Sequence, residues 1–439
     1  MMNFNKHYIV LILVAIYCMP LKPYAQDKFD IKKPVKPTAL VGGSLHIGNG
    51  KVIPNGIIGF DNGKISIVGT TDSIKLDSET YQVIDVSGQH IYPGFILLNS
   101  LIGIEEISGV PHSNDSMEEG SINPNLNTAF AFKSDSEFLP VIRFNGILTV
   151  ETVPRGGLVS GTSSVMKLDG RDWEESLYKF GAAIHLNWPN AMRSSYDAAT
   201  HTRQLKPNST YDTDIAELQN LFTQAITYGK RDDKIPNLKL QAMQGLFNGT
   251  LSLFVHATDP KEIIESIQFS KEMGIDHVAL VTAESALLVK DFLREHHIPV
   301  ILPPTHSVPG QVDMDYDIRY KLPYLLTNEG IVVAISHTGM LSTSRNLPFY
   351  AGVAAAYGLD KEDALKTISL NAAKILGVDD TLGSLEVGKD ATLFVSKGDA
   401  LDIRTNNLTQ AFIQGKKIEL EGKQQEQYKE CSKLLGHNE

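Results

Sequence analysis

The feature that most constrains this chain is a long middle region in which short apolar runs alternate with amphipathic helical stretches. The clearest strand candidates are residues 147–153, 182–187, 251–257, 277–282, 299–304 and 331–336. The stretches between them carry apolar residues at helical spacing. Alternation of strand and helix predicts a parallel α/β sheet, and its extent over 93–377 favours a TIM-type (β/α)8 barrel. A doubly wound open sheet is the alternative.

The two ends of the chain share a different pattern. Residues 38–92 and 378–420 consist of short β-branched runs separated by turns such as Gly-Asn-Gly, Pro-Asn-Gly and Asp-Asn-Gly. This is the turn chemistry of tight antiparallel hairpins. Because chain termini often lie close together, we expect the two segments to form one small composite β-sandwich domain, followed by a C-terminal tail over 421–439.

The first 25 residues have the order of a signal peptide. Lys6 and His7 precede an apolar run over 8–18, and a short polar segment leads to Ala25, after which we expect cleavage. Eleven apolar residues at about 1.5 Å each cannot cross a hydrocarbon core of about 30 Å. The pattern predicts a periplasmic or secreted protein with no membrane span after processing. An uncleaved buried helix is the alternative.

Charge and cysteine content exclude several classes of function. Lys and Arg number 40 against 51 Asp and Glu, which gives a formal net charge of −11. This charge repels nucleic-acid phosphates and anionic lipid headgroups, so we expect no nucleic-acid partner. The two cysteines, Cys18 and Cys431, cannot form a disulfide scaffold or a cysteine zinc cluster.

Three segments together resemble a known superfamily. They are HIYPGFI at 90–96, NAAKILGV at 371–378 and GSLEVGKDATLFV at 383–395. The chain is similar in these segments to the amidohydrolase superfamily, in particular its imidazolonepropionase-like members. The resemblance implies a barrel with a composite β-sandwich and hydrolysis of non-peptide carbon–nitrogen bonds in small or cyclic amides. It also implies a divalent metal such as zinc and leaves association into homo-oligomers open.

The residues at the expected metal positions depart from the family pattern. The first barrel strand of relatives reads like PGFID followed by His-x-His, whereas this chain has Leu97 at the Asp position and Asn99 and Leu101 at the two His positions. Leucine has no lone pair to donate, and a neutral amide oxygen is a poor zinc ligand. We therefore predict a degenerate metal site and no bound cofactor, with zinc expected only if this register is wrong.

Three further residues are candidates for catalysis. His256 matches the fifth-strand histidine of the family and is predicted as the one remaining metal ligand or catalytic group, with a hydrogen-bonded strand-end histidine as the alternative. Glu284 follows the strand that lacks the sixth-strand histidine. His337 stands beside Thr338, near the position where the family usually has Asp. One ligand does not hold a catalytic zinc, which normally takes three protein ligands.

Two residues are candidates for binding substrate. Asn99 could hold a substrate carbonyl, and the backbone N–H of Gly157, within the glycine-rich run 155–164, could hold an anionic group. A simple glycine turn is the alternative for Gly157. Two functions remain open from the sequence: a hydrolase of carbon–nitrogen bonds, and a non-catalytic small-molecule-binding protein on the same scaffold.

Overall fold

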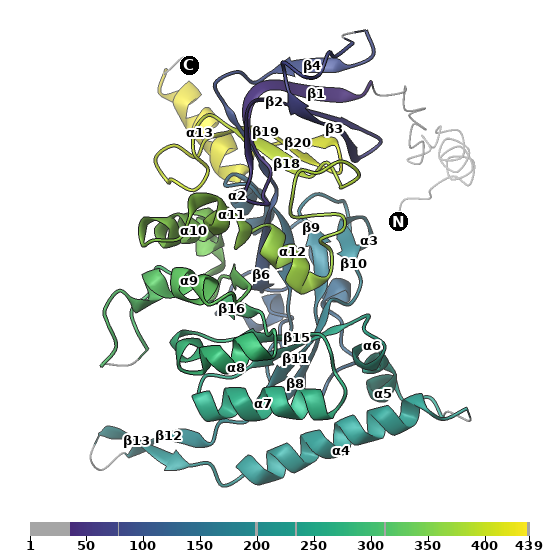
Figure 1. Ribbon diagram of the computed structural model, residues 1–439. Coiled ribbons are helices and arrows are strands. Elements are labelled where there is room, and N and C mark those ends of the chain that lie inside the picture. The colour runs from purple at the N-terminus through teal and green to yellow at the C-terminus, as the bar shows by residue number, and fades with distance from the viewer. Residues whose placement is uncertain (1–35, 78, 198–200, 233–234, 311–312, 437–439) are drawn as a thin grey trace, which may run out of the picture. The chain divides into compact units, whose positions relative to one another are not determined.

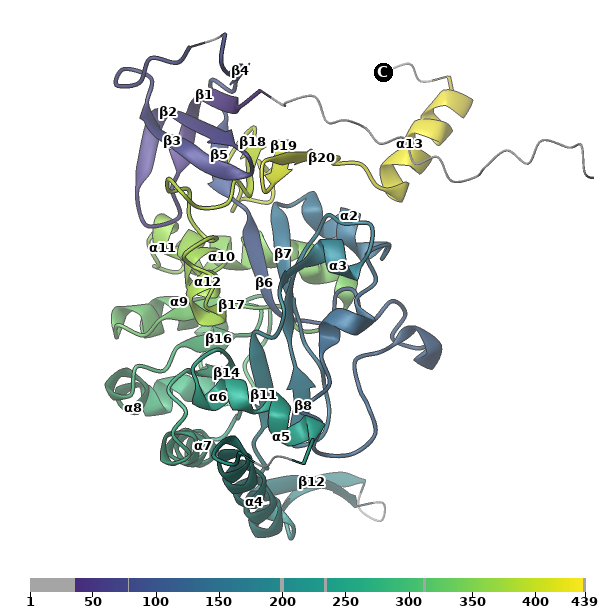
Figure 2. The same ribbon diagram turned by 90° about the vertical axis from the view of Figure 1, so that its right-hand side faces the viewer.

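The computed structural model describes residues 36–77, 79–197, 201–232, 235–310 and 313–436 (Figures 1 and 2). The predicted signal peptide, residues 1–25, lies outside them. The elements below all belong to one compact unit, Pro37–Glu439. Among the described helices, none combines the length and the apolar character that crossing a membrane requires.

One eight-stranded sheet takes its strands from both ends of the described chain. Its members are β1 (Thr38–His46), β2 (Val52–Asp61), β3 (Lys64–Thr70), β4 (Gln82–Asp85), β5 (His90–Pro93), β18 (Leu393–Ser396), β19 (Leu408–Ile413) and β20 (Lys416–Ile418). The ends meet where β5 pairs antiparallel with β18, which sets Ile91 opposite Val395. Figure 1 shows the purple and yellow strands side by side. Closure of these strands into a composite β-sandwich stays a prediction.

The turn residues explain the first hairpin of this sheet. β2 and β3 are joined by two residues, Asn62 and Gly63, whose φ angles are 47° and 80°. A two-residue hairpin whose turn matches the strand twist requires positive φ at both positions, which Asn and Gly adopt most readily. The Asp-Asn-Gly signal in the sequence therefore has the structural role that its chemistry predicts.

The middle of the chain forms two further sheets. Their strands are β6 (Phe95–Ser100), β7 (Ile147–Thr152), β8 (Val159–Thr162), β9 (Ser164–Lys167), β10 (Leu177–Lys179), β11 (Ala183–Asn187), β14 (Ser252–His256), β15 (Val278–Val281), β16 (Val300–Leu302) and β17 (Val333–Ile335). One sheet has the order β10-β9-β7-β6 and the other β17-β16-β15-β14-β11-β8. A parallel bridge between Leu98 and Ser336 connects them.

The strand pairing confirms a mixed α/β fold, and each of the six strand candidates of the middle region contains a strand. The ladders of the described residues do not, however, form a closed eight-stranded parallel barrel. β6–β7 and β11–β14–β15–β16–β17 are parallel, but β9 runs antiparallel to β7 and β8 antiparallel to β11. The glycine-rich run 155–164 supplies β8, and this short strand interrupts the simple alternation of strand and helix.

Helices cover the outer face of the six-stranded sheet (Figure 2). The α-helices are α2 (Phe138–Arg143), α3 (Trp173–Ser176), α4 (Tyr211–Gly229), α5 (Leu238–Ala242), α6 (Gln244–Phe247), α7 (Pro260–Glu272), α8 (Lys290–Glu295), α9 (Ile318–Asn328), α10 (Leu347–Ala356), α11 (Lys361–Lys366), α12 (Leu370–Leu376) and α13 (Lys423–Leu434). α7 begins as its sequence predicts: the Asp259 side chain accepts from the Lys261 N–H, and Pro260 occupies the first turn. The predicted tail contains α13.

The remaining short elements are the 3₁₀ turns η1 (Pro111–Ser113), η2 (Thr128–Ala131), η3 (Glu284–Val289) and η4 (Leu341–Asn346) and the hairpin β12 (Met192–Asp197) with β13 (Thr202–Pro207). Apolar side chains fill the space between strands of the two middle sheets. Leu98, Phe254, Ile301 and Ala334 are buried in one cluster. The interior is thus a packed core, and ligand space is left at the ends of the strands.

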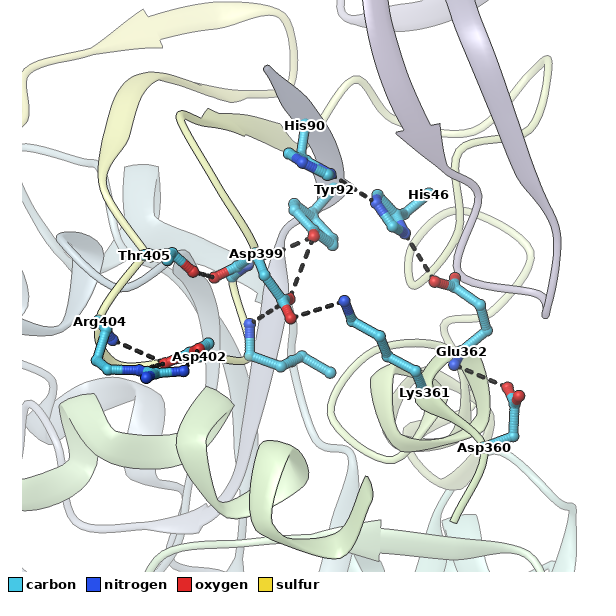
Figure 3. Close-up of polar contacts among 12 residues, drawn as sticks. His46, His90, Tyr92, Asp360, Lys361, Glu362, Asp399, Asp402, Arg404 and Thr405 are labelled. Carbon is cyan, nitrogen blue, oxygen red and sulfur yellow. Dashed lines mark hydrogen bonds and ion pairs between the residues drawn. The ribbon is translucent and has the colours of Figure 1, made fainter. Parts of the chain in front are cut away.

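A polar cluster joins the eight-stranded sheet to α11 (Figure 3). His46 Nδ1 lies 2.7 Å from Glu362 Oε1, and the His46 ring stacks on Tyr92 at a centroid distance of 4.3 Å. Lys361 Nζ lies 2.7 Å from Asp399 Oδ2. The other carboxylate oxygen of Asp399, Oδ1, accepts a long hydrogen bond from the Tyr92 hydroxyl. Side chains from both ends of the chain thereby hold α11 against the sheet.

Substitution of Phe394 tests whether the two ends of the chain pack against each other. Phe394 of β18 is fully buried; its ring stacks on Tyr92 of β5 at a centroid distance of 5.5 Å and packs edge to face on Phe95 of β6 at 5.0 Å. We expect Phe394→Ala to lower the free energy of unfolding by about 3–5 kcal/mol, since it removes a large side chain from a packed site. Urea denaturation measures this. Val387→Ala, at an exposed site, is the control; equal stability of both variants would contradict the packing described here.

Candidate functional site

A cavity of about 620 Å³ opens at the carboxyl ends of β6, β14, β15 and β17. Its lining consists of Asn99, Ser100, Leu101, Arg155, Asn187, Trp188, Asn190, His256, Ala257, Thr258, Val281, Thr282, Ala283, Pro303, Arg319, Ser336, His337, Thr338, Gly339, Leu341 and Ser344. The carboxyl edge of parallel strands is where α/β proteins commonly bind ligands. Three of the sequence-predicted site residues, Asn99, His256 and His337, lie in this one lining.

A buried carboxylate lies beneath the cavity. Glu151, in β7, is 0% exposed. Its Oε2 accepts the backbone N–H of Asn99 at 3.0 Å, and its Oε1 accepts the hydroxyl of Ser163 at 2.7 Å. His185 Nε2, from β11, lies 3.3 Å from the same Oε1. A buried charge is costly unless it is hydrogen-bonded, and these three donors satisfy that requirement.

His185 connects Glu151 to a residue of the cavity lining. His185 Nδ1 lies 3.0 Å from Nε2 of His256, which lines the cavity. With both rings neutral, His185 donates from Nε2 to the carboxylate and accepts at Nδ1 from His256. His256 then keeps its lone pair at Nδ1. Burial, together with the neighbouring His185 and Arg155, holds the pKa of His256 well below its ordinary value, so its ring is neutral at pH 7.

Arg155 fixes the end of β6. Its Nη1 donates to Asn99 Oδ1 at 2.6 Å and its Nη2 donates to the Asn99 carbonyl at 2.8 Å. Asn99 has a φ of 55°, a left-handed conformation that costs free energy in a non-glycine residue. Arg155 on one side and Glu151 on the other hold this conformation. Burial lowers the pKa of Arg155, and the carboxylates of Glu151 and Glu105 act against that shift.

His337 also lines the cavity, but its ring nitrogens are both engaged. Nε2 donates to the Met340 carbonyl at 3.0 Å, so Nδ1 accepts from the Tyr350 hydroxyl at 3.1 Å. Burial lowers the pKa of His337. Its hydrogen bonds indicate a residue that shapes the wall of the cavity and has no free lone pair for taking a proton.

Glu284 and Gly157 lie outside this lining. Glu284 Oε1 accepts from the Gly310 N–H at 2.6 Å and from Arg319 Nε at 3.1 Å. Burial alone would raise its pKa, but hydrogen bonds from backbone N–H groups and Arg319 outweigh burial and lower it. Gly157 has a φ of 64°, and a Cβ there would lie 2.6 Å from the Ser121 carbonyl oxygen. Close backbone approach explains this glycine.

Glu151, His185 and Arg155 were not predicted as site residues. A signal for the first two exists: a carboxylate within ILTVETV and a histidine within AAIHLN are ionisable groups inside otherwise apolar strands. Such groups are rarely buried without a partner. Arg155 stands at the start of the glycine-rich run, where it is not distinguishable from a surface arginine by sequence alone.

The donor set does not fit a divalent ion. Leu97 is fully buried in the apolar core, and Leu101 contributes only aliphatic surface to the cavity. The facing nitrogens of His185 and His256 contact each other, and Asn99 holds a cationic guanidinium. Within the described residues, no group of three His, Cys, Asp or Glu side chains could hold a metal ion.

Residues 325–418 match the sequence model of the amidohydrolase family, and no curated protein matches the chain. The fold is similar to an amidohydrolase from Thermotoga maritima MSB8, with a TM-score of 0.75 and 22% identity over 87% of this chain and 99% of that one. It is also similar to a prolidase complexed with N-methylphosphonate-L-proline (TM-score 0.52, 15% identity, 88% and 100% covered). A third similar structure is a zinc-bound adenosine deaminase from Xanthomonas campestris (TM-score 0.50, 16% identity, 87% and 92% covered).

These comparisons confirm the relationship that the sequence segments indicated. The sequence match falls on the region from α9 to β20, which includes the NAAKILGV and GSLEVGKDATLFV segments. The structural similarity extends over most of the described chain. Residues 325–418 are therefore similar in sequence to the amidohydrolase family, and the fold is similar to that of an amidohydrolase over the greater part of the chain.

Proposed function

We propose that this protein is a metal-independent hydrolase of carbon–nitrogen bonds other than peptide bonds, acting on small or cyclic amides. The observation that carries the proposal is the hydrogen-bonded chain Glu151–His185–His256, which ends in the cavity. A histidine that is neutral at pH 7 and is hydrogen-bonded through a second histidine to a carboxylate can act as a general base. The family relationship supports a hydrolase in the broad sense.

In this proposal His256 removes a proton from a water molecule through Nδ1. The water oxygen forms a bond to the amide carbon, and the proton at Nε2 of His256 is drawn toward His185 and Glu151. When the carbon–nitrogen bond breaks, the proton on His256 passes to the leaving nitrogen. Asn99 orients the substrate: its Oδ1 faces Arg155, so its Nδ2 is the end that donates to the carbonyl oxygen.

The finer parts of the scaffold belong to the same proposal. We infer a TIM-type barrel with a composite β-sandwich, supported by the single sheet that β5 and β18 share and by the similarity to an amidohydrolase fold. We also propose export to the periplasm or medium, supported by the order of charged, apolar and polar residues over 1–25.

The second candidate function is a small-molecule-binding protein without catalysis. It is favoured by Leu97 and Leu101, because aliphatic side chains stand where the family resemblance expects metal ligands and no alternative ligands replace them. In that case the cavity binds its ligand and the Glu151–His185–His256 chain serves only to satisfy buried polar groups.

Substitution of His256 separates the two functions. If His256 is the general base, His256→Asn should lower kcat on small amides by about 10²- to 10⁴-fold, and Glu151→Gln should lower kcat with less effect on KM. Turnover of an amide panel by purified protein is the measurement. His277→Asn, at an exposed histidine away from the cavity, is the control. Undiminished turnover in His256→Asn would remove the general base from this proposal.

Metal titration tests the donor set. Because a ligand that binds only the native state raises the melting temperature, zinc, manganese and magnesium should leave Tm unchanged when added to the purified protein. The measurement is Tm by thermal denaturation over a range of metal concentrations. Saturable stabilisation that is lost in His256→Ala would show that the cavity holds an ion after all.

The lowered pKa of His256 also predicts how stability depends on pH. Below the unfolded pKa of about 6.5 the unfolded chain binds a proton at this histidine that the native chain does not, so stability falls as pH decreases. One such group changes the free energy of unfolding by up to about 1.4 kcal/mol per pH unit.

We expect His256→Asn to flatten the fall in stability between pH 7 and pH 5. Urea denaturation at several pH values measures the slope for the wild type and the variant, and the His277→Asn protein serves as the reference. Identical slopes in wild type and His256→Asn would mean that His256 is not kept neutral by its surroundings.

A further inference from the structure

An asparagine at the end of β11 faces the same cavity as His256. Asn187 is the last residue of β11, lines the cavity and lies opposite His256 in the parallel pairing of β11 with β14. Side chains in register on neighbouring parallel strands point to the same face of the sheet. His185, two residues earlier on β11, points to that face as well, since its ring contacts His256. Asn187 and His256 therefore enter the cavity side by side.

Hydrogen bonds decide which end of the Asn187 amide faces the ligand space. Its Nδ2 donates to the Gly157 carbonyl at 2.8 Å and to the Ser160 hydroxyl oxygen at 2.9 Å. An amide nitrogen carries two N–H groups, and these two bonds use both of them. A carbonyl oxygen such as that of Gly157 needs a donor, so the nitrogen must lie on this side. Oδ1 is the end that remains for a ligand, and no described residue donates to it.

The Oδ1 atom of Asn187 is accessible to a ligand. The side chain is half-buried, and Oδ1 is not one of the fully buried polar atoms that lack a partner. An acceptor at the surface of a cavity can bond to water in the absence of ligand, and a ligand N–H can take the place of that water. Since Nδ2 already holds the amide plane, binding does not have to order this side chain.

Asn99 presents the opposite end of its amide to the cavity. Its Oδ1 accepts from Arg155 at 2.6 Å, so Nδ2 is the end that faces a ligand. The cavity thus offers one oriented amide donor, on Asn99, and one oriented amide acceptor, on Asn187. An amide that carries an N–H presents the complementary pair, a carbonyl oxygen and a donor. An ester or a tertiary amide has the carbonyl oxygen but lacks the donor.

Few other groups of the lining could accept a ligand N–H. The lining contains no Asp or Glu. Both ring nitrogens of His337 have hydrogen-bond partners, and Nδ1 of His256 takes the proton of water in the proposed mechanism. Asn190 also lines the cavity, but its side chain is exposed and no contact within the described residues orients it. Asn187 therefore supplies the amide acceptor whose direction is fixed.

We propose that Asn187 selects amides that carry an N–H, namely primary and secondary amides, cyclic ones included, by accepting that N–H at Oδ1 while Asn99 donates to the carbonyl oxygen. This inference rests on the proposed function and narrows its substrate class. It also places the leaving nitrogen next to His256, the residue that returns a proton to it when the carbon–nitrogen bond breaks. Binding itself requires no turnover.

The test compares two amides that share a ring and a carbonyl group but differ at nitrogen. Isothermal titration of the purified protein uses 2-phenylacetamide and N,N-dimethyl-2-phenylacetamide. A primary amide presents an N–H on either side of its nitrogen, so the result does not depend on which side faces Asn187. We expect the primary amide to bind about tenfold more tightly, because the dimethyl compound leaves Oδ1 without a donor. Equal affinity, or tighter binding of the dimethyl compound, would overturn the proposal.

Two variants of Asn187 separate recognition of the N–H from steric exclusion of the methyl groups. Asn187→Leu and Asn187→Asp both lose the Nδ2 bond to Gly157, so they share any structural defect that this loss causes. Only the Asp variant keeps an acceptor toward the ligand. We expect the preference for the primary amide to fall below about twofold in Asn187→Leu and to remain in Asn187→Asp. A preference that survives in Asn187→Leu, or that disappears in both variants, contradicts the role of Oδ1.

Asn190→Leu is the matched control. It removes a second asparagine from the same lining, one whose amide has no orienting hydrogen bond within the described residues. The preference for the primary amide should be retained in this variant. Its loss would assign the selection to Asn190 and overturn the assignment to Asn187.

Turnover of the same two amides separates this inference from the proposed function. Both release phenylacetate on hydrolysis, the primary amide together with ammonia and the tertiary amide together with dimethylamine. Hydrolysis of both with equal kcat/KM and equal affinity overturns selection by Asn187 and leaves the hydrolase in place. Tighter binding of the primary amide without release of phenylacetate removes the hydrolase for this substrate and supports the selection.

Discussion

The charge of Glu151 is the constraint on which the site depends. A carboxylate that is 0% exposed is stable only if donors surround it, and these donors come from different parts of the fold. The Asn99 N–H belongs to β6, the Ser163 hydroxyl lies between β8 and β9, and the His185 ring belongs to β11. Few backbone hydrogen bonds connect the two middle sheets, so the contacts of Glu151 also fix how these two sheets pack together.

The same carboxylate links stability to the geometry of the cavity. By accepting the Asn99 N–H it supports a left-handed backbone at the end of β6, and Arg155 holds the other side of that residue. Left-handed conformations of non-glycine residues persist where the surroundings over-determine them, and they are common at functional sites. Glu151 therefore supports both the left-handed conformation of Asn99 and the orientation of His256.

Much of the fold follows from the sequence, and less of the site does. Turn chemistry such as Asn62-Gly63 and the alternation of strand and helix are local signals, so each strand candidate of the middle region contains a strand. The antiparallel pairing of β8 and β9 depends on partners distant in sequence, which no local pattern reports. The family resemblance pointed to His256 and Asn99, which both line the cavity, whereas Glu151 and His185 gave only the general signal of ionisable groups in apolar strands, and their connection is visible only in their contacts.

One chemical argument accounts for two features of the site. Asn99 and Leu101 stand where the family resemblance expects metal-ligating histidines, and the Glu151–His185–His256 chain ends in the cavity. A metal ion activates water by coordination and also supplies positive charge to the substrate oxygen. Asn99, which Arg155 holds at Oδ1, can donate to the substrate oxygen but cannot activate water, so this site must obtain its base elsewhere. A histidine whose pKa is held low by burial is neutral and able to accept a proton at pH 7. Division of the two tasks between Asn99 and His256 is therefore the arrangement that such a site requires if it hydrolyses amides.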